Sequence, residues 1–300
     1  MAPTPQVPYD EFSLFGENAE EFGIPYNGPP TVRRTSVDIS EGRRLSALVW
    51  GDGPPELVLL HGGAQNAHTW DTVALALGRP LLALDLPGHG HSDAGREGSL
   101  DARDNARDVA AALRSLAPGA AAVVGMSLGG LTTLALYDVA PELVQRIVLV
   151  DITPGVTAEK SAAISAFVNG PERFDSLDDL LARTIEHNPT RSVSSLRRGI
   201  LHNAVQLADG TWMWRYARHR ALERTGRPGF AELWEVVSKV EVPLMLVRGM
   251  LAQSVVDDDD EAELVRRCPN ARVEHITAAG HSVQGDTPLE LAQLVAGFIA

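Results

Sequence analysis

The sequence predicts an α/β fold in which helices cover both faces of a mostly parallel β-sheet. Short apolar segments bounded by Gly or Pro alternate with segments of helical periodicity along most of the 300 residues. A Gly-Met-Ser-Leu-Gly sequence at residues 125–129 stands between one such strand and one such helix. Strands and helices that alternate in this way form a parallel sheet covered on both faces. A chain of this length can hold one large domain, with or without an inserted subdomain.

The first thirty residues precede this alternation and differ from it in composition. Pro, Gly and acidic residues predominate there, with aromatic residues scattered between them. We expect residues 1–30 to form an irregular arm that lies on the surface rather than an independent domain.

The sheet is expected to begin with a hairpin and to continue with parallel strands. Residues 32–39 and 45–50 are predicted as strands joined by a turn at Glu41-Gly42, as in an antiparallel hairpin. The alternation then sets in. Strands are expected at residues 56–60, 81–86, 121–124 and 146–152, and helices at residues 68–77, 101–116 and 128–139.

The alternation stops between residues 153 and 240. This segment contains helical stretches interrupted by Gly and Pro and no convincing strand, which predicts a helical cap inserted over one end of the sheet. The core is then formed by residues 31–152 and 241–300. The cap helices are expected at residues 158–167, 177–185, 194–205 and 230–237, and the sheet resumes with strands at 243–248 and 271–276 and helices at 260–267 and 288–299.

Ser127 has the surroundings of a nucleophile. It follows an apolar strand and precedes a helix, and Gly125 and Gly129 lie two residues away on either side. A serine in so sharp a strand-to-helix turn has strained backbone, and only glycine at the flanking positions lets the strand and the helix pack closely around it. The turn presents the hydroxyl and directs the amide of Leu128 to the same space, at the positive end of the helix.

A nucleophilic serine needs a base and an acid, and candidates follow two other strands. Functional side chains of parallel sheets gather at the carboxyl ends of the strands. Asp151 ends the strand after the one that carries Ser127, and His281 lies in a small-residue loop after the last strand. Asp257 is the alternative acid, although its place at the start of an acidic helix is better explained by capping. Ser127, Asp151 and His281 would then form the triad.

Four motifs in the same order identify the chain as a member of the α/β-hydrolase fold superfamily. The resemblance covers residue 31 to the C-terminus, and the insertion is similar to the cap of such enzymes. Its motifs are His61-Gly62-Gly63 after the third strand, residues 85–92 (DLPGHGHS) after the fourth, Gly125 to Gly129, and Gly280-His281 after the last strand.

The resemblance assigns further roles. It implies an oxyanion hole made by the backbone amides of Gly63 and Leu128, and structural roles for His61 and His89. The triad acid usually follows the strand after the insertion, where this chain has Ser254 and no carboxylate before Asp257. A minority of the family places the acid where Asp151 stands.

The cap and the two loops supply candidate substrate contacts. Trp212 and Trp214 are large apolar side chains of the cap, and we expect them to line a pocket over Ser127, unless they only form the cap's own core. Gly62 and Met126, which neighbour Gly63 and Ser127 in the sequence, are further candidate substrate contacts.

Composition limits the partners. A net charge of −13 argues against nucleic acid or an anionic membrane, and no apolar stretch is long enough to span a bilayer. The acidic run at residues 257–263 is interpreted as a solvated helix start. His68, His202 and the other remaining histidines are expected to have structural roles. No metal site is expected. No secretory signal is recognised, which makes the cytoplasm the default. The oligomeric state is left open, with a homodimer as one option.

These observations predict a serine hydrolase that cleaves a small to medium carboxylic ester or lactone through an acyl-enzyme on Ser127. No cofactor is expected. Two alternatives stay open. A carbon–carbon bond hydrolase of the diketone type would use the same three residues, and a ligand-binding receptor could keep the fold without catalysis.

Overall fold

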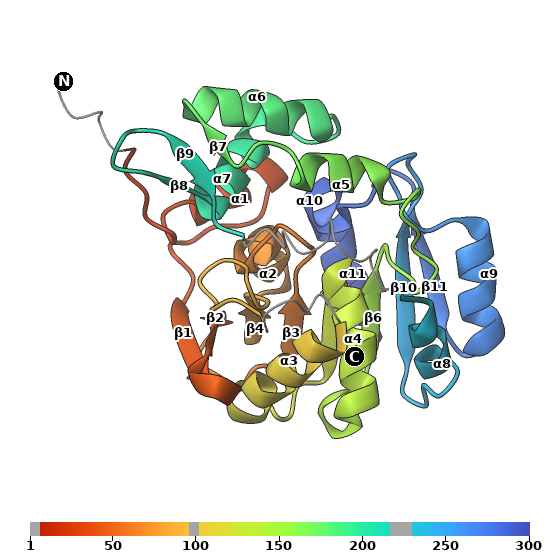
Figure 1. Cartoon of the computed structure of the whole chain (residues 1–300). Coiled ribbons are helices and arrows are strands. Elements are labelled where there is room, and N and C mark those ends of the chain that lie inside the picture. The colour runs from red at the N-terminus through yellow and green to blue at the C-terminus, as the bar shows by residue number, and fades with distance from the viewer. Residues whose placement is uncertain (1–6, 96–101, 217–229) are drawn as a thin grey trace.

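The computed structural model describes residues 7–95, 102–216 and 230–300 and contains one large sheet (Figure 1). The sheet has eight strands in the order β1-β2-β4-β3-β5-β6-β10-β11. Strands β1 and β2 form the expected antiparallel hairpin, β2 is antiparallel to β4, and the remaining pairs are parallel. The eight strands are β1 (Val32–Asp38), β2 (Arg44–Trp50), β3 (Leu57–Leu60), β4 (Leu81–Leu84), β5 (Ala122–Met126), β6 (Ile147–Val150), β10 (Leu244–Gly249) and β11 (Arg272–Ile276).

Helices cover both faces of this sheet, which confirms the predicted fold class. Strand residues alternate between two apolar cores, as the period of two requires: Val58 and Leu60 face one core and Leu57 and Leu59 the other. The first core includes α3 (Ala102–Leu116), α4 (Leu128–Val139) and α8 (Leu233–Val237), and the second includes α2 (Asp71–Leu77) and α11 (Pro288–Ile299). The other helical elements of the core are η1 (Ser40–Gly42), η2 (Ala67–Trp70), η3 (Pro141–Leu143), η5 (Phe230–Glu232), α9 (Asp258–Arg267) and α10 (Val283–Asp286).

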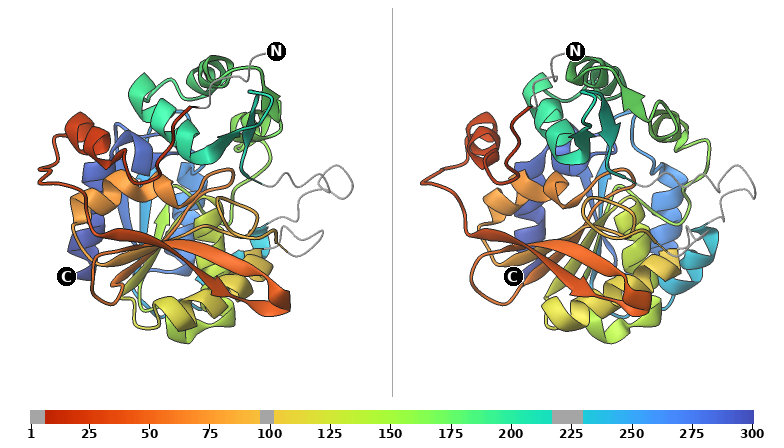
Figure 2. Two further views of the ribbon diagram at one scale, coloured as in Figure 1. Left: turned by 90° about the vertical axis from the view of Figure 1, so that its left-hand side faces the viewer. Right: turned by 60° about the vertical axis from the view of Figure 1, so that its left-hand side comes forward.

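Residues 153–216, which follow β6, lie over one end of the sheet (Figures 1 and 2). Helix α7 (Val193–Asn203) of this segment contacts the loop after β3, where the Asn203 side chain donates to the carbonyl of Ala64 at 2.6 Å. The cap therefore covers the carboxyl ends of the parallel strands. Its helices are α5 (Ala162–Val168), α6 (Leu177–His187) and α7 (Val193–Asn203). The expectation of a cap helix at residues 230–237 is wrong in its placement, because α8 packs beside α4 in the first core.

The expectation that the cap has no strand is wrong. It contains a small antiparallel sheet in the order β7-β9-β8, formed by β7 (Arg173–Phe174), β8 (Ala204–Gln206) and β9 (Trp212–Trp214). Each strand has only two or three residues, which is too short for an alternation of apolar and polar residues to be recognised. Residues 217–229 of the expected cap lie outside the described residues.

The expectation of an irregular N-terminal arm is also wrong in part. Residues Phe15–Phe22 form helix α1, which ends at Gly23 in the left-handed conformation, with φ of 66°. Phe15 and Ala19 are buried, and Phe15 packs on Trp50 with ring centroids 4.9 Å apart. The arm is thus part of the folded domain. Among the described residues, no helix has the length and apolar character required to cross a bilayer.

Arg198 of α7 joins the cap to α1. Its side chain is 3% exposed, donates to Asn18 Oδ1 at 2.8 Å and is hydrogen-bonded to the carboxylate of Glu21. A buried guanidinium needs such partners, and its loss leaves the Asn18 side-chain oxygen without this donor and the Glu21 carboxylate without this cation.

We expect Arg198→Ala to lower the free energy of unfolding by about 2–4 kcal/mol, because a buried ion pair loses one partner. Urea denaturation measures this difference. The matched control is Arg197→Ala, since Arg197 is the exposed neighbour on the same helix and should change stability by less than about 0.5 kcal/mol. Equal effects of the two substitutions would contradict the role of Arg198.

Candidate active site

Ser127 occupies the turn between β5 and α4 with strained backbone. Its φ is 50° and its ψ is −117°, values that a non-glycine residue rarely adopts. The helix packs closely on the neighbouring strand, because a Cβ atom at Gly129 would overlap the carbonyl of Leu60. A Cβ atom at Gly125 would likewise overlap the backbone of Gly129 and Gly130. Both glycines are therefore required by close backbone approach, as the sequence suggested.

Asp151 lies beside this turn at the end of the neighbouring strand. Strands β5 and β6 are parallel with Met126 opposite Val150, so Ser127 and Asp151 follow at the same level. Asp151 also has positive φ, 48°, and its side chain is fully buried. The carboxylate is held from the β10 side. Oδ1 accepts from Gly249 N–H at 2.9 Å and from Ser254 Oγ–H at 2.6 Å, and Oδ2 accepts from Val255 N–H at 3.1 Å.

His281 completes the contacts of this carboxylate. Its Nδ1 lies 2.9 Å from Asp151 Oδ2, and the residue is 8% exposed. The hydrogen bond places the Nδ1 proton toward Asp151 and leaves Nε2 as the basic nitrogen. The His281 loop is fixed by Gly280 N–H, which donates to Asp286 at 2.9 Å, and by Leu251 N–H, which donates to Ala279 O at 3.0 Å.

Ser127 is the third residue of the candidate triad. Within the described part of the chain, Ser127 Oγ makes no hydrogen bond, and the residue is partly exposed. The acid and the histidine are thus assembled, while the serine is placed by the adjacent strand. Contacts between nucleophile and base are often long in proteins without substrate and shorten when substrate binds.

Asp257 is engaged elsewhere. It is the N-cap of α9 and accepts from Asp260 N–H at 2.9 Å in a capping box. It also forms an ion pair with Lys160 at 2.7 Å, and this hydrogen bond lowers the pKa of Asp257. Asp151, and not Asp257, contacts His281.

Two backbone amides near Ser127 are available to bind an anion. Neither Gly63 N–H nor Leu128 N–H donates a hydrogen bond to any described residue. Leu128 is the first residue of α4, where the helix dipole favours negative charge. A Cβ atom at Gly62 would contact Met126 and Ser127, so the Gly62-Gly63 turn adjoins the serine.

His61 and His89 hold the loops around these amides. His61 Nε2 accepts from Leu86 N–H at 2.9 Å, so its Nδ1 carries the proton and donates to Gly62 O at 2.7 Å. His89 Nε2 accepts from Ala64 N–H at 3.0 Å. Full burial lowers the pKa of His61, which keeps the ring neutral. Both rings have the structural roles that the sequence analysis expected.

Trp212 and Trp214 lie in the core of the cap. They are 5% and 7% exposed, and Trp214 packs edge-on against Phe174 with ring centroids 6.0 Å apart. Ala64, next to Gly63, belongs to the same apolar cluster. Burial of this degree favours the cap-core role over the lining of an open pocket. Substrate contact by Trp212, Trp214, Gly62 and Met126 stays a prediction.

The main-chain donors to Asp151 could not be predicted from the sequence. Gly249 and Val255 act through their backbone N–H groups, which no residue type signals. Ser254 was recognised only as the residue at the place usual for the acid. A small hydroxyl residue there was the available signal, because it can donate to a carboxylate on the neighbouring strand.

Comparison with known proteins identifies the family. A model of the alpha/beta hydrolase fold matches residues 55–288. The chain belongs to this family. The esterase Rv0045c of Mycobacterium tuberculosis is 46% identical over 299 residues, covering 97% of this chain and 96% of that protein. A 2-(acetamidomethylene)succinate hydrolase of Mesorhizobium japonicum is 28% identical over 252 residues, covering 83% and 89%.

Solved structures of Rv0045c resemble this chain throughout. One, described together with transition metal inhibition of that esterase, has a TM-score of 0.83 at 45% identity and covers 97% of this chain and 99% of that chain. A second crystal structure has a TM-score of 0.82 at 44% identity and covers 98% and 99%.

We expect Gly129→Ala to impair both folding and the elbow, because its Cβ atom would overlap the carbonyl of Leu60. The melting temperature should fall by several degrees, corresponding to about 1–3 kcal/mol. Gly119→Ala is the control, since a Cβ atom there meets nothing within 4 Å. An unchanged melting temperature for Gly129→Ala would contradict the close packing described.

Removal of the Ser254 hydroxyl should weaken the hold on Asp151. A hydrogen bond to a charged group contributes about 1.5–3 kcal/mol, and we expect Ser254→Ala to lower kcat/KM for an ester roughly 10- to 100-fold. Ser254→Thr keeps the hydroxyl and should retain most of the activity. Equal activity of the Ala variant and the wild type would show that Ser254 does not position the carboxylate.

Proposed function

We propose that this protein is a carboxylic ester hydrolase in which Ser127 is the nucleophile. The single observation that carries the proposal is the assembly of His281 with the buried carboxylate of Asp151 beside a serine held at positive φ. The likeness to the esterase Rv0045c, over nearly the whole of both chains, supports the ester as the substrate class.

The proposed mechanism assigns each group one task. Ser127 Oγ attacks the ester carbonyl while His281 Nε2 takes its proton, and the alkoxy group leaves with that proton. Asp151 holds the imidazole in the required tautomer and stabilises its charged form. The amides of Gly63 and Leu128 bind the oxyanion, and each such donor is worth about 2.7–4 kcal/mol.

Water then hydrolyses the acyl-enzyme. His281 removes a proton from the attacking water and returns it to Ser127 as the acid product leaves. No cofactor enters this sequence, and a lactone would react in the same way, with the alcohol remaining attached to the acyl group.

Two substitutions test the nucleophile and its base. Ser127→Ala and His281→Gln should each lower kcat for a p-nitrophenyl ester by at least about 10³-fold, because members of a triad act as a unit. A fluorophosphonate should label Ser127 in the wild type and fail to label Ser127→Ala, as read by mass spectrometry of the labelled peptide.

The outcomes also separate the alternatives. If Ser127 is labelled but the protein cleaves a vinylogous diketone and neither esters nor lactones, the protein is a carbon–carbon bond hydrolase and not an ester hydrolase. Absence of both labelling and turnover in the folded wild type would favour a ligand-binding receptor and overturn the proposal.

A further inference from the structure

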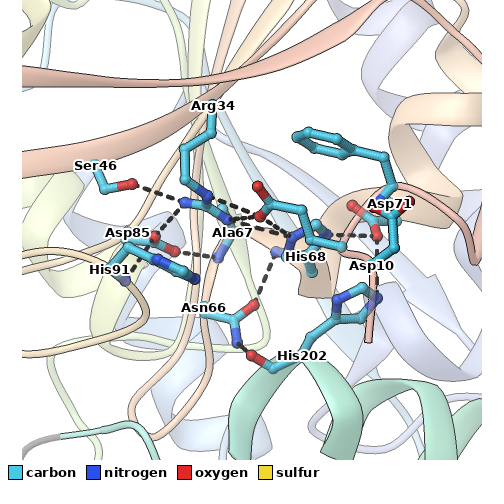
Figure 3. A network of polar contacts seen from close by, with 12 residues as sticks. Asp10, Arg34, Ser46, Asn66, Ala67, His68, Asp71, Asp85, His91 and His202 are labelled. Atoms are coloured by element: carbon cyan, nitrogen blue, oxygen red, sulfur yellow. Dashed lines mark hydrogen bonds and ion pairs between the residues drawn. The ribbon is translucent and has the colours of Figure 1, made fainter. Parts of the chain in front are cut away.

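A buried polar cluster that shares no residue with the candidate triad lies where the core, the cap and the N-terminal segment meet (Figure 3). Its centre is formed by His68 of η2, Asp71 at the start of α2, and His202 of α7. All three residues are buried, and one nitrogen or oxygen atom of each lies within 4.8 Å of those of the other two. Two segments more than a hundred residues apart in sequence thus converge on one point.

Both imidazoles are oriented by oxygen atoms of the N-terminal segment. His68 Nε2 lies 3.2 Å from a carboxylate oxygen of Glu11, and His202 Nδ1 lies 2.8 Å from the hydroxyl of Tyr9. Each ring therefore has one nitrogen held by an oxygen partner and presents the other, His68 Nδ1 or His202 Nε2, to Asp71. Metal-binding histidines characteristically have this arrangement, in which the second nitrogen donates to an oxygen atom.

Two polar atoms of the cluster lack hydrogen-bond partners among the described residues. They are His202 Nε2 and Asp71 Oδ1, in residues that are 4% and 2% exposed. The separation of His202 Nε2 from Asp71 Oδ2 is 3.7 Å, too long for a hydrogen bond. An unpaired buried polar atom costs about 1–3 kcal/mol, and a ligand between the two side chains would remove this cost.

The spacing suits a metal ion. In a tetrahedral site with bonds of about 2.0–2.2 Å, ligand atoms lie roughly 3.3–3.5 Å apart. The present distances to Asp71 Oδ2, 2.9 Å from His68 Nδ1 and 3.7 Å from His202 Nε2, fall on either side of this value. The two rings are stacked with centroids 3.9 Å apart, so ligation requires the His202 ring to tilt toward Asp71.

The local charge suits a cation as well. Glu11, Asp71 and Asp85 bring three carboxylates to the network, and Arg34 is the guanidinium that pairs with Glu11 and Asp85. Although burial opposes its charge, Asp71 and Glu11 raise the pKa of His68 to about 9, so a bound ion would have to displace the proton of this ring. Once that proton has left, two negative charges remain at this junction. A divalent ion would balance them.

We propose that His68, Asp71 and His202 bind one divalent transition-metal ion, such as Zn²⁺ or Co²⁺. Two imidazoles and one carboxylate are ligands that these ions accept, and a water molecule would complete the coordination. Because His202 belongs to the cap and the other two ligands to the core, the ion clamps the cap to the core.

Titration of the full-length, chelator-treated protein with Co²⁺ tests the site. We expect binding of one equivalent with the intense visible absorption of four- or five-coordinate Co²⁺, and displacement by Zn²⁺. Zn²⁺ should also raise the melting temperature of the wild type, because it binds the folded state. A wild type that develops no such spectrum would overturn the proposal without any variant.

Substitutions locate the site. His202→Gln should weaken Co²⁺ binding at least 100-fold, and Tyr9→Phe, which removes only the oxygen partner of His202, should weaken it roughly 10- to 100-fold. His202→Cys keeps a ligand and should retain binding with a new thiolate-to-metal charge-transfer band. This variant also serves if His202→Gln fails to fold.

Two controls separate this site from other histidines. His187→Gln changes another histidine of the cap, on α6, and should bind Co²⁺ like the wild type. His281→Gln changes the candidate catalytic base and should also leave the affinity unchanged. Loss of binding in His281→Gln with full binding in His202→Gln would place the ion at the triad and overturn the proposal.

Discussion

The buried carboxylate of Asp151 is the contact around which the site is organised. Isolated in the protein interior, a carboxylate would be strongly disfavoured, and here two backbone amides, one hydroxyl and one imidazole surround it. These donors come from the end of β10, from the loop that follows it, and from the loop after β11. Solvation of one charge therefore fixes two loops and the histidine relative to the strand beside Ser127. The backbone at Asp151 has positive φ, a strain that these contacts offset.

A second set of polar contacts holds the cap over the site. Helix α7 reaches the loop after β3 through Asn203 and the N-terminal helix through Arg198, and its His202 faces His68 and Asp71. These polar contacts are directional, whereas the apolar contacts within the core of the cap are not. The cap is therefore positioned by hydrogen bonds and ion pairs that specify one orientation, and the loop that carries Gly63 lies directly beneath it.

Much of the site was predictable because its physics is local. The strand, the serine turn and the helix of the elbow follow one another in sequence, and Asp151 and His281 each end or follow a strand of recognisable length. The elements that escaped prediction depend on distant contacts. Helix α1 has eight residues and packs on Trp50 and the cap, and the strands β7, β8 and β9 exist only because they pair with one another. Too few residues carry either pattern for the sequence alone to reveal it.

The contact between Tyr9 and His202 has a consequence for the order of assembly during synthesis. The two residues are 193 positions apart, so the N-terminal segment leaves the ribosome long before its partner in the cap. At translation rates of 5–20 residues per second, this interval is roughly 10–40 s. For that time Tyr9 has no cap partner and remains open to chaperones and proteases, and the nascent chain completes this junction only after most of the cap has been made.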